Sequence, residues 1–132
     1  MQFVGMSTVA VLVAAGAGFA VGAAWYGVLG KAWMAAARLG PDDVKPSPGP
    51  FITALVADLV MAYLLAGVIG HLGEVTPRAG VITASLLWLG FVITTMAVNH
   101  AFQGAKTALT LIDGGHWLVV LVVMGAVIGA IG

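Results

Sequence analysis

The sequence predicts an all-α integral membrane protein, a bundle of four transmembrane helices in antiparallel up-down topology. Hydrophobic residues make up 61% of the 132 positions and charged residues only 8%, against roughly 45–50% and 25% in ordinary domains. A soluble domain of this size leaves much of its surface in water, so it has no room to bury so many apolar side chains. The apolar residues also form four long stretches separated by short polar connectors, the arrangement that a multi-pass helical protein requires.

The counts of charged residues and cysteines exclude several other classes of protein. Five basic and five acidic residues give a formal net charge of zero, with no basic patch for a phosphate backbone, so we expect no nucleic-acid partner. The low charge and high hydropathy exclude a disordered chain. Because there is no cysteine, the chain has no disulfide framework, thiolate nucleophile or cysteine-bound metal.

We predict a single transmembrane domain over residues 1–132, with spans at about 3–29, 51–72, 79–102 and 108–131. Each stretch holds at least the roughly 20 helical residues that cross about 30 Å of hydrocarbon. A secretory signal peptide needs a basic segment before its apolar core. No Lys or Arg precedes Lys31, so the first stretch is predicted to be a retained span.

The connectors carry their own signals. KAWMAAARLG follows the first span and predicts a short helix lying at the membrane interface, since its basic residues flank Trp33. Residues 40–50 contain four prolines and predict a stiff, extended linker. Thr76 before Pro77 is typical of a helix N-cap. The two later connectors are short, so the second, third and fourth spans should form antiparallel hairpins.

The basic residues predict the orientation in the membrane. Lys31, Arg38, Lys45 and Lys106 fall in connectors on one side, whereas the other side carries only Arg78. Cytoplasmic loops are enriched in Lys and Arg. We therefore expect a multi-pass protein of the inner (cytoplasmic) membrane of a bacterium, with both termini in the periplasm.

Small residues recur every four positions in three of the spans. Helices in lipid associate through close packing of such residues, because lipid tails provide no hydrophobic drive. The ridges predict packing within one four-helix bundle or an interface of a homo-oligomer, and these two interpretations are compatible. The ridge residues are Ala10, Ala14, Gly18 and Gly22 in the first span, Ala54, Ala62, Ala66 and Gly70 in the second, where Asp58 takes the position between Ala54 and Ala62, and Gly125 and Gly129 in the fourth.

Polar side chains gather in the half of the membrane that the orientation assigns to the cytoplasm. A carboxylate at the centre of a span costs roughly 2.5–3.5 kcal/mol, and Asp58, nearer the cytoplasmic end, costs less but still implies a partner. One interpretation is a structural hydrogen bond to Trp25, Tyr26, His100 or His116, and the other is a ligand-binding or proton-carrying role. We call the whole set the polar cluster: Trp25, Tyr26, Asp58, Asn99, His100, Gln103, Asp113 and His116.

Two further alternatives stay open within this cluster. Asp113 is either an N-cap, with Gly114 opening the last helix, or a buried functional carboxylate. Histidine side chains ligate haem and chlorophyll-type macrocycles, so His100 and His116 could hold such a group. The chain shows no metal-ligand spacing such as H-x-x-x-H, no phosphate loop and no nucleophile elbow. We therefore expect no catalytic residues, no metal and no enzymatic activity.

Four motifs carry a resemblance to a known family. GAAWYGVLGKAWM ends the first span, WLGF starts at Trp88, NHAFQG starts at Asn99, and LIDGGHWLVVLVVMGAVIGA forms the fourth span. In this order they resemble the bacterial domain-of-unknown-function family numbered 1761, small four-span membrane proteins. The resemblance covers nearly the whole chain. It implies the fold and the membrane location and assigns no activity or catalytic residue.

The sequence favours a non-enzymatic structural or accessory subunit of a homo-oligomer or larger membrane complex, surrounded by membrane lipid. The alternative is a transporter of a small solute, a lipid or protons that uses the polar cluster. A haem or pigment protein is a third alternative. We expect no cofactor, and a bound lipid stays open.

Overall fold

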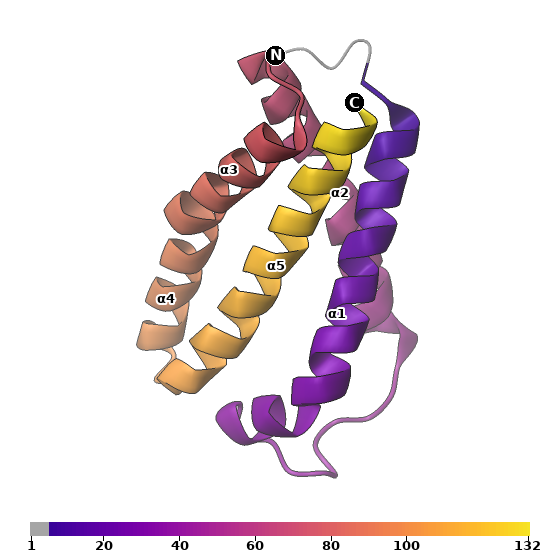
Figure 1. Ribbon diagram of the computed structural model, residues 1–132. Helices are drawn as coiled ribbons and strands as arrows, with labels where there is room; N and C mark the ends of the chain where they lie inside the picture. Colours follow the sequence, from indigo (N-terminus) through magenta and orange to yellow (C-terminus); the bar gives the residue numbers. More distant parts are fainter. Residues whose placement is uncertain (1–5) are drawn as a thin grey trace.

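The computed structural model describes residues 6–132, which are helical throughout apart from the connectors and contain no strand (Figure 1). Four helices are long and apolar enough to cross a membrane, as predicted. The third of these spans is continuous from Pro77 to Phe102, because a π-helical segment joins its two α-helical parts. The elements are α1 (Thr8–Ala36), α2 (Pro48–Leu72), α3 (Pro77–Leu87), the π-helix Trp88–Val92, α4 (Ile93–Phe102) and α5 (Thr107–Ile131).

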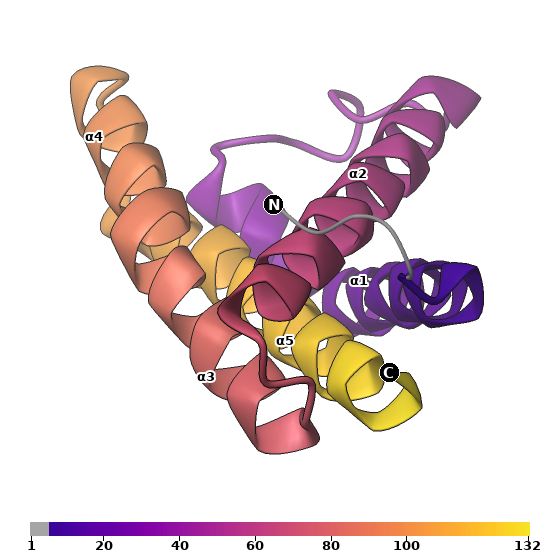
Figure 2. The same cartoon turned by 90° about the horizontal axis from the view of Figure 1, so that it is seen from above.

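The last helix, α5, lies at the centre of the molecule. It packs against α1 on one side and α3 on the other, and α2 contacts both α1 and α5 (Figure 1). Seen from above, α2 and α4 diverge on the same side of α5 (Figure 2). No Cα atom of α2 lies within 8 Å of one in α4, and both helices are described in full. The other helices therefore pack against α5, whereas α2 and α4 do not pack against each other.

Two connectors lie at the same end of the bundle. The α1–α2 and α4–α5 connectors are both at the lower end in Figure 1, whereas the first turn of α1 and the last turn of α5 lie at the upper end. We call the lower end the basic end, because Arg38, Lys45 and Lys106 belong to its connectors.

The first helix runs further than predicted. The segment that we expected to form a separate interfacial helix instead continues α1 to Ala36, because its alanines favour helix and no proline interrupts them. The helix ends with Arg38 in the left-handed region at φ 58°. There the N–H of Leu39 donates to the carbonyl of Met34 at 2.8 Å, the 6→1 bond of a Schellman motif.

Two helix starts follow from their sequences. α2 begins at Pro48, slightly before the predicted start, with proline at its first position, where the missing N–H leaves no bond unmade. Thr76 caps α3, since its Oγ1 accepts a hydrogen bond from the Ala79 N–H at 3.1 Å. The predicted cap is confirmed, and the helix begins directly after it.

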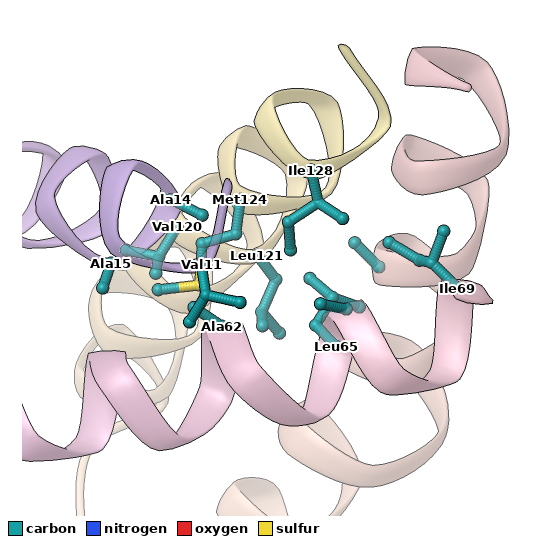
Figure 3. Packing of buried hydrophobic residues seen from close by; sticks show 12 residues of the cluster. Val11, Ala14, Ala15, Ala62, Leu65, Ile69, Val120, Leu121, Met124 and Ile128 are labelled. Atoms are coloured by element: carbon teal, nitrogen blue, oxygen red, sulfur yellow. The ribbon is translucent and has the colours of Figure 1, made fainter. Parts of the chain in front are cut away.

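The apolar core lies where α1, α2 and α5 meet (Figure 3). Ala14, Ala62, Val120 and Met124 are fully buried there. Short side chains on α1 and α2 let the larger ones of α5 fill the space between the helices. The labelled core residues are Val11, Ala14, Ala15, Ala62, Leu65, Ile69, Val120, Leu121, Met124 and Ile128.

The small-residue ridges pack inside the chain. A Cβ added at Gly125 would collide with the carbonyl of Gly80, and one added at Gly129 would collide with the carbonyl of Thr76, so α3 and α5 touch through their backbones. A Cβ at Gly18 would meet the Met124 Cε at 2.5 Å. Intramolecular packing therefore accounts for the ridges of the first and fourth spans.

Candidate functional site

A hydrogen bond joins α1 to α5 near the basic end. The Tyr26 hydroxyl donates to Oδ1 of Asp113 at 2.7 Å, and both side chains are half-buried. Since α1 and α5 run in opposite directions, residues late in α1 lie opposite residues early in α5. A hydrogen bond between side chains is worth more in a membrane-facing bundle, where water does not compete for either partner. The pair therefore ties the two helices together at this end.

Asp113 lies within α5 and does not cap it. The helix begins at Thr107, with Lys106 in the N-cap position. The N-cap interpretation of Asp113 is therefore wrong, because TALTLI before it is already helical. The structure instead makes Asp113 an acceptor for a side chain of another helix.

Two tryptophans donate to backbone carbonyls of α5. The Trp25 Nε1–H of α1 donates to the Ile112 carbonyl at 3.1 Å, and the Trp88 Nε1–H donates to the Gly114 carbonyl at 2.8 Å. A carbonyl has two lone pairs, so it accepts an indole as well as its own helix bond. A Cβ at Gly115 would lie 3.1 Å from the Trp25 ring, so this glycine makes room for the indole.

His116 fills the space beside Gly22. Its ring lies 4.9 Å from the Tyr26 ring and 4.5 Å from the Trp117 ring, between centroids. A Cβ at Gly22 would be 3.1 Å from the His116 Nε2. The side chain is 7% exposed, and its Nδ1 has no hydrogen-bond partner among the described residues. His116 thus belongs with Trp25, Tyr26 and Asp113 in one α1–α5 contact.

A groove opens between α2 and α4. We call it the α2–α4 groove; its volume is about 400 Å³. Asn99, His100 and Gln103 line it near the basic end, so these members of the polar cluster lie together. His100 Nδ1 also lies 2.7 Å from the Thr110 hydroxyl of α5, in a hydrogen bond. The other lining residues are Met61, Phe91, Val92, Thr95, Met96 and Trp117.

Asp58 is separate from both groups. It is 3% exposed on α2, and the structure shows no hydrogen bond from it to another described residue. The predicted bond to Trp25, Tyr26, His100 or His116 is absent from residues 6–132, because the first three of these side chains bond elsewhere and His116 packs against Gly22. α2 begins ten residues earlier, at Pro48, so Asp58 lies about 15 Å along the helix.

The π-helix Trp88–Val92 was missed in the sequence. In this segment the backbone hydrogen bonds run from residue i to i+5 instead of i+4, so each turn holds more residues. Such π-helical turns occur frequently at functional sites. The hydroxyls of Thr94 and Thr95 donate to the carbonyls of Gly90 and Phe91, at 2.8 and 2.6 Å. Both hydroxyls thus find an acceptor within their own span, as polar groups in a membrane helix require. A glycine followed by two threonines in mid-span was the available signal.

The chemistry of the site is that of hydrogen bonding. No group of three or more His, Asp or Glu side chains placed to hold a metal ion occurs in residues 6–132. The α1–α5 contact joins helices, and the groove offers amide and imidazole groups beside an apolar wall.

The fold and these contacts define an all-helical protein whose four long apolar helices suit a membrane and are tied together by polar side chains near one end. The chain belongs to the family described as "Protein of unknown function (DUF1761)", whose model matches residues 9–129. No curated protein and no solved structure matches it. The motifs WY, WLGF, NHAFQG and LIDGGHW supply the contacts described above.

Proposed function

We propose that this protein is a non-enzymatic structural or accessory subunit of a homo-oligomer or larger complex in the inner membrane. The observation that carries the proposal is the exposure of the third span. Only 11% of its most apolar window is buried inside the chain, against 44% for α5. Since α4 has no buried residue, most of this span is free to contact lipid or another protein.

The outward face of the third span has the composition of a helix–helix interface. Gly90, Thr94, Ala97 and Ala101 recur at spacings of three and four residues, and all four are exposed. A Cβ added at Gly90 would find no atom within 4 Å. Small residues at this spacing let a neighbouring helix approach closely in lipid. We call these four residues the outer α4 face.

The use of the polar side chains also supports a structural role. Interhelical hydrogen bonds use the side chains of Tyr26, Asp113, Trp25 and Trp88, which thereby hold the bundle together. The α2–α4 groove opens sideways between helices. A bundle whose outer α4 face is uncovered suits a subunit that packs against a partner.

Purification in a mild detergent tests the proposal. The mass of the full chain should correspond to a homo-oligomer or to a stoichiometric complex with another protein. Ala97→Leu should weaken this association by filling the outer α4 face, whereas Ala20→Leu, at an exposed position on α1, is the matched control. A monomer without any partner would contradict the proposal, and a visible absorption band would favour the pigment alternative.

Asp58 favours the transporter as a second candidate. A carboxylate that is buried in a membrane helix without a hydrogen-bond partner is costly, and such residues mark ion or substrate pathways. Proteoliposomes containing the full chain and a pH-sensitive dye would report proton flux. Flux that Asp58→Asn abolishes would support transport, and no flux in the unmodified protein would favour the accessory subunit.

A further inference from the structure

We propose that the α2–α4 groove binds one anionic phospholipid, with its phosphate beside Arg38 and Gln103 and an acyl chain along the apolar wall. This ligand goes beyond the proposed function and does not depend on it, because a monomer without a protein partner has the same groove.

The length of the groove matches one leaflet. Its lining runs along the third span from Phe91 to Gln103, twelve residue steps or about 18 Å. The hydrocarbon core is about 30 Å thick, so the groove covers little more than half of it. At the other end α3 and α5 touch through Gly80 and Gly125. A partner helix would cross both leaflets, whereas a lipid occupies one.

The polarity of the groove changes along its length. Phe91, Val92 and Met61 line the part nearer the middle of the span, where an acyl chain would lie. Asn99 and Gln103 line the part near the basic end; both are exposed, and no hydrogen bond joins either side chain to another described residue. Each amide has an NH₂ group that donates to phosphate or ester oxygens. This order of apolar and polar groups is that of an amphiphile.

The charge at the polar end favours an anionic headgroup. The Arg38 Nη1 donates to the Gly104 carbonyl at 3.1 Å, and Gly104 directly follows Gln103 of the groove. A guanidinium has five N–H donors, so others remain for a phosphate. Asp42 and Asp43 are the nearest acids along the chain. Asp43 accepts from the Gly40 N–H, and no ion pair joins Arg38 to either carboxylate.

The backbone of Arg38 supports the same assignment. Arg38 ends α1 at φ 58°, the left-handed conformation that glycine usually occupies in this motif. A non-glycine residue is strained there, and such strain persists where the surrounding structure or a function requires the side chain. Here the side chain reaches across to the α4–α5 connector, at the end of the groove.

Native mass spectrometry of the full chain tests the proposal, with phosphatidylglycerol and phosphatidylcholine of identical acyl chains as probes. The unmodified protein should retain phosphatidylglycerol about five-fold better, the factor for one basic residue at an anionic surface. Arg38→Gly relieves the backbone strain, so it should stay folded and lose this preference. Lys31→Gln removes an exposed charge from α1 and should keep it.

A second variant tests the position of the acyl chain. Thr95→Trp fills the groove from an exposed position and should reduce retention of both lipids. Equal retention of the two lipids by the unmodified protein, or an unchanged preference in Arg38→Gly, would overturn the proposal. A protein that cross-links to Asn99→Cys inside the groove would also overturn it, while supporting the proposed function.

Discussion

The hydroxyl of Tyr26 donates a 2.7 Å hydrogen bond to the carboxylate of Asp113, across 87 residues of sequence. This bond closes α1 onto α5 near the basic end, where His116 and Trp25 pack around it. The first and last spans of the chain are thereby joined by side chains that the sequence places in two separate motifs.

Removing this bond should destabilise the protein. Tyr26→Phe leaves the carboxylate without its donor and should lower the free energy of unfolding by about 1.5–3 kcal/mol. Asp113→Asn keeps a carbonyl acceptor and should lower it less. Tyr26→Phe and Asp113→Leu remove the same bond. The double variant should therefore lose less stability than the sum of the losses measured for Tyr26→Phe alone and Asp113→Leu alone. Equilibrium unfolding in mixed micelles measures this, and additive losses would show that the residues are not coupled.

The backbone contact between α3 and α5 predicts a strong effect of one methyl group. Gly125→Ala would push α5 away from the Gly80 carbonyl and should cost about 1–3 kcal/mol, as overpacking does. Gly16→Ala is the control, because a Cβ there finds open space and alanine is the better helix former. Similar unfolding free energies for the two variants would count against this contact.

The indole of Trp88 should stabilise the π-helical part of the third span. Trp88→Phe keeps an aromatic ring but loses the donor to the Gly114 carbonyl, so the free energy of unfolding should fall by about 1 kcal/mol. Trp33→Phe is the matched control, since Trp33 contacts Tyr26 through its ring. If Trp33→Phe costs as much as Trp88→Phe, the hydrogen bond contributes little.

The orientation is tested by reporter fusions. The excess of Lys and Arg in the connectors of the basic end predicts that this end is cytoplasmic. Alkaline phosphatase fused after Gly132 should be active, and the same enzyme inserted within residues 41–47 should be inactive. An inactive fusion after Gly132 together with an active insertion would reverse the predicted orientation.

The spans could be predicted because their signal is local. Length and hydropathy define them, and the Thr76–Pro77 pair defines the start of α3. The small residues at Gly18 and Gly125 predicted close packing, since few other functions need glycine in mid-helix. The extent of α1 was missed because basic residues in an alanine-rich segment suit an interfacial helix and a continued helix equally well.

The partners of the polar side chains could not be predicted. The polar cluster was predicted because its residues lie at a similar depth in the membrane. Depth alone does not determine the direction in which a side chain points. Tyr26 therefore faces Asp113, whereas Asp58 has no hydrogen-bond partner among the described residues. The groove lies where α4 diverges from α2 (Figure 2), and no local sequence pattern specifies this arrangement of helices.

The central claim is that the outer α4 face contacts another protein, and site-directed photo-cross-linking in native membranes tests it most directly. The chain has no cysteine, so Ala97→Cys carries a benzophenone maleimide at one position only. We predict a cross-linked product of defined mass from this position and none from Val28→Cys, which is 83% exposed on α1. No product from Ala97→Cys, or the same products from both positions, would contradict the account.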